Sequence, residues 1–270
     1  MKDQPLSPPD PHRQQKLSAF DRLLTIMDEL RENCPWDKKQ TMQTLRHLTI
    51  EETYELGDAI IENNMEEVKK ELGDLILHLV FYARIGSEKE AFDISDVLHS
   101  VSDKLVRRHP HIYGDVVATD EKAVKENWEK IKLKEKGNQT VLGGVPKSLP
   151  AMVKAMRIQE KAKGAGFDWD QKEQVWEKVQ EELQEFQVEI DTGTSQEKIN
   201  AEFGDILFSL INYARFVDID PEEALERTNK KFIRRFNFLE KAVNEDRKEL
   251  TKMSLDEMNE YWEAAKSEEH

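Results

Sequence analysis

The sequence holds one cysteine, nine prolines and eleven glycines among 270 residues, and each shortage excludes a class of protein. The single thiol, Cys34, cannot form an internal disulfide, which argues against a disulfide-rich secreted domain. Scarce glycine and proline exclude collagen-like and low-complexity chains and favour helices. Because no apolar run reaches about 18 residues and no signal-like segment is visible, we expect a cytoplasmic protein without a membrane partner.

Several catalytic motifs are also missing. The sequence contains no G-x-x-x-x-G-K-[ST] phosphate loop, no G-x-G-x-x-G dinucleotide motif, no G-x-S-x-G, no H-E-x-x-H and no C-x-x-C. P-loop hydrolysis of nucleotides, dehydrogenase, serine hydrolase and zinc peptidase chemistry are therefore excluded.

Acidic residues outnumber basic ones by 55 to 40, and the net charge is −15. Sequence-independent affinity for nucleic acid comes from Lys and Arg that neutralise phosphates, so we expect no nucleic-acid partner. An acidic chain can still bind a small phosphate compound through a metal ion.

The chain contains an internal repeat of about 130 residues. EETYE at 51–55 and ELGDLILHLVFYAR at 71–84 recur as EELQE at 181–185 and EFGDILFSLINYAR at 202–215. Further along, KLVRR and NWEKIK recur as KFIRR and YWEAAK. The repeat predicts two tandem domains with the following bounds: a flexible tail at 1–16, a first domain at 17–135, a linker at 136–150 and a second domain at 151–270.

The hydrophobic pattern within each half is helical. Residues 45–62, 66–86 and 92–108 carry apolar side chains at spacings of three and four, and no alternating run predicts a strand. Ser195 is typical of an N-cap that opens a helix of about twenty residues. The segments LILHLVFYA and ILFSLINYA are apolar on nearly every face, so we expect them in the middle of a bundle or at a dimer interface. The fold class predicted is all-α.

Each half carries two pairs of carboxylates with helical spacing. In the first half these are Glu52 with Glu55 and Glu71 with Asp74, each pair three residues apart on one helix face. If the two helices pack antiparallel, four carboxylates share one pocket, which is unfavourable without a cation. Oxygen-only ligands select Mg²⁺ or Mn²⁺ before Zn²⁺. The alternative for such a glutamate-rich pattern is a solvated helix face, although Asp74 leads directly into an apolar helix.

Glycines and cations accompany the carboxylates. Gly73 and Gly204 precede the aspartates inside helical patterns, which predicts a close approach of backbone or ligand. The first-half set Lys104, Arg107 and Arg108 recurs in the second half and suits phosphate oxygens, the alternative being a solvated helix end. Trp128 and Trp262 are either core residues or platforms for a base. We interpret His109 and His111 as part of a loop.

These motifs together resemble the MazG family of bacterial nucleoside triphosphate pyrophosphohydrolases. The resemblance rests on CPWDKKQT at 34–41, EETYE, ELGD, DKLVRRHPHIYGD at 103–115 and NWEKIK, and it extends from about residue 17. It implies all-α domains whose bundles are completed by homodimerisation. It also implies Mg²⁺-dependent hydrolysis of NTPs and dNTPs, ATP included, to monophosphate and pyrophosphate.

The same resemblance implies that the second half is catalytic. It places metal ligands at Glu182, Glu185, Glu202 and Asp205, phosphate contacts at Lys231, Arg234 and Arg235, and further nucleotide contacts at Lys178, Glu181, Lys198 and Trp262. The first half keeps Glu52, Glu55, Glu71 and Asp74, but Leu48 and Glu67 stand where the second half has Lys178 and Lys198. The first set is therefore a second metal site of uncertain activity.

Our mechanistic hypothesis is attack of a metal-bound water on the α-phosphorus, with Glu181 or a ligand carboxylate as the base. Two alternatives stay open. One is a non-catalytic helical nucleotide sensor or scaffold, and the other is a pyrophosphohydrolase restricted to dUTP or phosphoribosyl-ATP.

Overall fold

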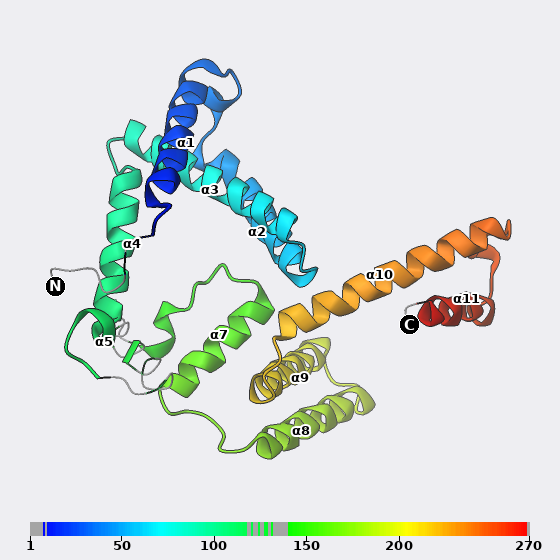
Figure 1. Cartoon of the computed structure of the whole chain (residues 1–270). Coiled ribbons are helices and arrows are strands. Elements are labelled where there is room, and N and C mark those ends of the chain that lie inside the picture. The colour runs from blue at the N-terminus through cyan, green and yellow to red at the C-terminus, as the bar shows by residue number, and fades with distance from the viewer. Residues whose placement is uncertain are drawn as a thin grey trace. The chain divides into compact units, whose positions relative to one another are not determined.

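The computed structural model describes residues 8, 10–117, 120, 124, 127, 128, 131 and 140–268. Throughout these residues the regular elements are α-helices and short 3₁₀ helices, and none is a strand, which confirms the all-α prediction. The chain divides into two compact units, Met1–Gly137 and Asn138–His270. Figure 1 shows the helices of both, and each unit is described by itself.

The first unit is built around α3, whose apolar sequence predicted a central position. This helix packs against α1, α2 and α4, and its residues Val80, Phe81 and Ile85 form one buried cluster with Met27 and Leu45. The bounds in this unit are α1 (Arg13–Asn33), 3₁₀ helix η1 (Asp37–Lys39), α2 (Met42–Ile61), α3 (Met65–Glu88), α4 (Ile94–Arg108) and α5 (Pro110–Tyr113).

Two expectations about this unit were wrong. The predicted tail at 1–16 overlaps α1, because the Asp10 carboxylate accepts a hydrogen bond from the His12 backbone N–H and pairs with Lys16, which holds the chain where the helix opens. His111, interpreted as part of a loop, lies in α5, because Pro110 supplies the backbone angle that a first helical residue needs. The rest of the tail lies largely outside the described residues.

The second unit repeats the arrangement around α9, which packs against α8 and α7. The Ser195 side chain accepts a hydrogen bond from the Lys198 backbone N–H, so the predicted N-cap is confirmed. The bounds are η2 (Val141–Gly144), α7 (Ala151–Gly164), α8 (Lys172–Asp191), α9 (Gln196–Phe216), α10 (Pro221–Glu245), η3 (Leu250–Lys252) and α11 (Leu255–Ser267).

Two helix pairs carry the candidate functional residues of the second unit. Helices α8 and α9 form an antiparallel hairpin joined by a four-residue turn, whereas α10 packs mainly against α11 and more slightly against α7 (Figure 1). Leu239, Val243 and Ala265 are buried on α10 and α11. Among the described helices of both units, none has the length and apolarity to cross a membrane.

Candidate functional site

Three carboxylates meet on the α8–α9 hairpin. One oxygen each from Glu182, Glu185 and Glu202 lies within 4.8 Å of the other two. Glu182 and Glu185 are one turn apart on α8, and Glu202 faces them from the first two turns of α9, since the hairpin is antiparallel. Glu182 is buried, Glu202 is half-buried and Glu185 is exposed. We call these three residues the second triad.

The first unit contains the equivalent group on α2 and α3. Oxygens of Glu52, Glu55 and Glu71 also lie within 4.8 Å of one another, and we call them the first triad. The predicted fourth members, Asp74 and Asp205, fall outside the two triads. Each is one turn further along its helix, where its charge raises the pKa of Glu52 or Glu202 respectively.

In each triad, burial and repulsion between neighbouring carboxylates disfavour ionisation of all three carboxyl groups. Burial raises the pKa of Glu202 above its ordinary value, and the charges of Glu185 and Asp205 raise it further. Burial likewise raises the pKa of Glu52, reinforced by its hydrogen bond to Glu71. A raised carboxyl pKa means that the folded chain disfavours the charged form, which a bound cation would reverse.

A lysine contacts each triad, but from a different helix in each unit. Lys178 Nζ lies 2.8 Å from both Glu181 Oε1 and Glu182 Oε1, on α8. In the first unit the lysine is Lys70 on α3, whose Nζ lies 2.8 Å from Glu71 Oε1 and lowers the pKa of that carboxyl. The residue equivalent to Lys70 in the second repeat is Ala201. Our sequence reasoning missed Lys70, although its position beside Glu71 was visible.

The donors present fit a hard divalent cation. All are carboxylate oxygens, and Glu71 Oε2 is buried without a hydrogen-bond partner among the described residues. Glu189 Oε2 is buried in the same unpartnered way, and its charge also raises the pKa of Glu202. Sequence reasoning missed Glu189, which continues the stripe of Glu182 and Glu185 on α8; the first repeat has Ala59 there.

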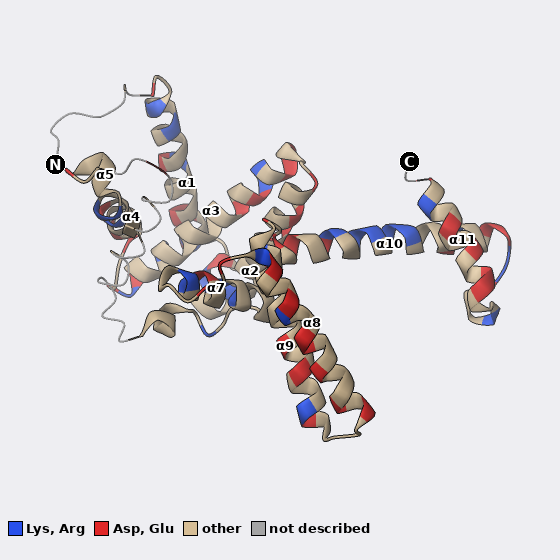
Figure 2. Cartoon of the chain, turned by 90° about the horizontal axis from the view of Figure 1, so that it is seen from below, with Lys and Arg blue, Asp and Glu red and all other residues tan. Residues whose placement is uncertain are grey.

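The predicted phosphate-binding residues lie on α10. Figure 2 shows basic residues gathered along this helix and acidic residues on the α8–α9 hairpin. Lys231 and Arg234 are exposed, while the Arg235 guanidinium lies 5.9 Å from the centre of the Trp262 ring. Trp262 is half-buried and contacts Phe232, with 5.0 Å between ring centres. The first unit repeats the contact, with Arg108 lying 5.3 Å from the Trp128 ring centre.

Among the described residues, the helix that carries the cations packs mainly against other helices than the two that carry the carboxylates. Helix α10 packs with α11 and α7, whereas α8 packs with α9. Lys198 lies exposed in the first turn of α9. The carboxylates are therefore brought together by the hairpin, and the cations join Trp262 in a separate group.

The expected close approach at the two helical glycines is not found within the chain. A Cβ added at Gly73 or Gly204 would have no neighbour within 4 Å among the described residues. That part of the prediction, as far as it concerned the chain's own backbone, was wrong. Both positions are open space beside a triad member.

Comparison with known proteins bears on this geometry. The model of the MazG nucleotide pyrophosphohydrolase domain matches residues 40–113 and, a second time, residues 171–238. The chain belongs to the MazG family. The two matched ranges of this MazG chain contain one triad each, which confirms both the resemblance and the repeat.

Relatives of this MazG chain match nearly its whole length. It is 43% identical over 251 residues to the nucleoside triphosphate pyrophosphohydrolase/pyrophosphatase MazG of Thermotoga maritima, covering 92% of this chain and 95% of that protein. It is 41% identical over 260 residues to the nucleoside triphosphate pyrophosphohydrolase of Escherichia coli K12, covering 94% and 99%. An uncharacterized Bacillus subtilis protein, YabN, is 46% identical over 96% of this chain and 54% of its own length.

Proposed function

We propose that this MazG chain is a Mg²⁺-dependent nucleoside triphosphate pyrophosphohydrolase that releases nucleoside monophosphate and pyrophosphate. The observation that carries the proposal is the second triad, three carboxylates converging within 4.8 Å on two helices of a family domain. The printed names of the Thermotoga and Escherichia relatives support the same activity.

In this proposal Glu182, Glu185, Glu202 and Asp205 hold the metal, with Mn²⁺ as a possible substitute. A bound Mg²⁺ would supply an acidified water and neutralise phosphate oxygens. Glu181, whose carboxylate now pairs with Lys178, accepts the proton of the attacking water. Asp205 is exposed one turn beyond Glu202 on α9 and would complete the ligand set.

The cations act on the leaving pyrophosphate. Lys231, Arg234 and Arg235 neutralise the charge that develops there, and Lys178 and Lys198 contact the nucleotide from the hairpin. Trp262, held against Phe232 and Arg235, offers an aromatic face to the nucleotide.

We assign catalysis to the second unit. Its hairpin carries Lys178 and Lys198, whereas the first repeat has Leu48 and Glu67 at those positions. The buried carboxylate of each triad pairs with one lysine, so the assignment rests on the two additional cations of the second hairpin.

We further propose that the protein is a homodimer. Large apolar side chains on the central helices remain exposed, including Leu79 on α3 and Phe203 and Leu207 on α9. A second copy covering these faces would complete the bundles that each unit leaves open.

The first experiment incubates the purified protein with Mg²⁺ and a panel of NTPs, dNTPs including dUTP, and phosphoribosyl-ATP. We expect monophosphate and pyrophosphate from several nucleotides, and no turnover when EDTA removes the metal. Turnover of dUTP or phosphoribosyl-ATP alone would favour a narrow specificity. Nucleotide binding without Mg²⁺-dependent turnover would favour the sensor or scaffold.

A double variant, Glu202→Gln with Asp205→Asn, tests the metal assignment. We expect a folded protein, judged by its helical circular dichroism, that no longer releases pyrophosphate. Retained turnover would place the metal elsewhere.

A further inference from the structure

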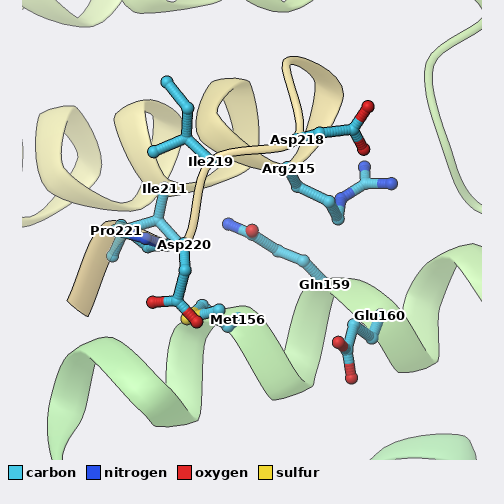
Figure 3. A pocket seen from close by; sticks show the side chains of 9 residues that line it. All are labelled: Met156, Gln159, Glu160, Ile211, Arg215, Asp218, Ile219, Asp220 and Pro221. Carbon is cyan, nitrogen blue, oxygen red and sulfur yellow. The ribbon is translucent and has the colours of Figure 1, made fainter. Parts of the chain in front are cut away.

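A cavity lies in the second unit, at the opposite end of α9 from the second triad. It has a volume of about 260 Å³ and opens between α7, the last turns of α9 and the segment leading into α10 (Figure 3). Arg215 in its wall is thirteen residues after Glu202 on one helix, which is about 20 Å along the axis. The cavity is therefore separate from the carboxylate site.

A buried amide lies in this cavity with an unused acceptor. Figure 3 shows the Gln159 side chain rising from α7 toward α9. It is only 6% exposed, and its Nε2 donates to the Phe208 carbonyl oxygen at 2.8 Å. Because a carbonyl oxygen accepts this bond, the donor must be the amide nitrogen, which fixes the orientation of the Gln159 amide. Its Oε1 is buried without a partner among the described residues. A buried acceptor without a donor costs free energy, so a ligand that supplies one is favoured.

The other polar groups of the cavity are also mostly acceptors. Carboxylates of Glu160, Asp218 and Asp220 line it, although Glu160 already pairs with Arg157, and Arg215 is the one cation among the lining residues. The Arg215 guanidinium is already engaged by Asp168, with a 2.9 Å bond to Oδ2, and by Asn212 Oδ1 at 2.8 Å. Asp220 Oδ1 accepts from the first backbone N–H groups of α10, which leaves Oδ2 for a ligand. The lining thus demands donors and positive charge.

The rest of the wall is aliphatic. Met156 faces Ile211, Ile219 and Pro221 across the cavity. A water molecule occupies about 30 Å³, so the cavity has room for several of them. The same space accommodates a short aliphatic chain whose ends bond to polar groups. Apolar sides and acidic ends match a molecule with the reverse pattern, a hydrocarbon chain that ends in ammonium groups.

We propose that this cavity is a binding site for a small aliphatic ammonium compound, such as a short diamine. One ammonium group donates to Gln159 Oε1 and to Asp220, and the exposed carboxylate of Asp218 adds negative charge at the rim. Because the wall includes the end of α9 and the first residue of α10, an occupied site ties the two helices together.

The test is calorimetric titration of the full chain with 1,4-diaminobutane, with Mg²⁺ saturating so that the triads are filled. The uncharged 1,4-butanediol is the matched ligand. We expect saturable binding of one diamine per chain, at least about tenfold tighter than the diol. Absence of saturable binding, or equal affinity for the diol, would overturn the proposal and leave a water-filled cavity.

Variants locate the binding. Asp218→Asn, at an exposed position, is expected to weaken the diamine about tenfold, and Gln159→Leu to abolish its binding. Asp21→Asn removes the same charge from an exposed position on α1 and is expected to change nothing. Binding that survives Asp218→Asn unchanged, or that falls equally in the Asp21→Asn control, would refute the site without relying on the fold of the Gln159 variant.

Discussion

At the scale of residues, the two triads have the same composition but different environments. Glu182 on α8 is the buried member of the second triad, whereas Glu71 on α3 is the buried member of the first. Each buried carboxylate has a lysine 2.8 Å away, Lys178 in one case and Lys70 in the other. Spacing in the sequence predicted that the carboxylates meet, but it did not predict which one is buried.

The unfavourable charge of Glu202 in the second triad predicts an effect on thermal stability. Replacing Glu202 with Gln removes a charge that burial and neighbouring carboxylates disfavour, so we expect Tm without metal to rise. The same variant is expected to lose the rise in Tm that Mg²⁺ gives the wild type. Thermal unfolding followed by circular dichroism, with and without Mg²⁺, measures both. An unchanged response to Mg²⁺ would show that Glu202 is not a ligand.

A matched pair of substitutions tests which unit is catalytic. Glu182→Gln and Glu52→Gln alter equivalent triad members in the two units. We expect the first to lower kcat/KM by about a hundredfold or more, since a metal ligand is lost. The second is expected to leave the rate within about twofold. Pyrophosphate release is the readout, and equal losses would assign activity to both units.

At the scale of elements, capping residues close in sequence define where helices begin, whereas a tertiary contact holds the loop before α8. Thr41 and Ser195 are the N-caps of α2 and α9, so the first residues of these helices follow from the local sequence. The loop is different, because Asp168 is held by Arg215 from the end of α9, with a 2.9 Å bond to Arg215 Nη1. A pairing 47 residues apart cannot be predicted from helical periodicity.

This ion pair predicts a pH-dependent loss of stability. Burial alone would raise the pKa of Asp168, but the hydrogen bond and charge of Arg215, the Trp169 backbone N–H and the charge of Lys163 together outweigh it and lower the pKa below its ordinary value. A carboxyl with a lowered folded pKa stabilises the fold above its ordinary pKa, and that contribution is lost as the pH falls through the folded value. We expect Asp168→Asn to destabilise the second unit by about 2 kcal/mol at neutral pH.

The destabilisation should shrink as the pH falls through the lowered pKa of Asp168, because the wild-type carboxyl then becomes protonated as well. Urea unfolding at neutral pH and at a series of falling acidic pH values measures the change. Asp191→Asn, at an exposed position, serves as the control and should have a small effect at every pH. A loss of stability that is the same at every pH would argue against the ion pair.

At the scale of the whole molecule, the question is how carboxylates and cations reach one substrate. In one chain α10 packs mainly on α11, and Leu239, Val243 and Ala265 are buried on these two helices, whereas α8 packs mainly on α9. Under the proposed homodimer, the α10 of the second copy supplies Lys231 and Arg234 to the triad. Dimer assembly can bring the cations to the carboxylates while the buried contacts between α10 and α11 stay intact. Bringing them together within one chain would require those contacts to unpack.

Complementation tests this arrangement. Glu182→Gln and Lys231→Met are each expected to be inactive alone. If the cations act across the dimer, an equal mixture with random exchange should recover about a quarter of wild-type activity, since half the dimers are mixed and each has one intact site. If both groups belong to the same chain, the mixture stays inactive. Light scattering must show dimers in both cases.

The helices and the repeat followed from the sequence alone, and the same spacing predicted the two groups of carboxylates. Helix spacing is local, so the pairs around Glu52 and Glu182 and the caps at Thr41 and Ser195 follow from neighbours a few residues apart. The double family match rests on the same motifs. These properties depend on interactions that the chain makes with itself over one or two turns.

The tertiary structure alone decided which groups are buried and which meet. Packing of α8 on α9 buries Glu182 and brings Glu189 near Glu202, while α10 packs mainly on α11. The cavity around Gln159 likewise depends on α7, α9 and α10 meeting at one point. The burial of a group and its pairing with distant residues depend on many contacts throughout the fold. The residue spacing within one segment therefore does not predict them.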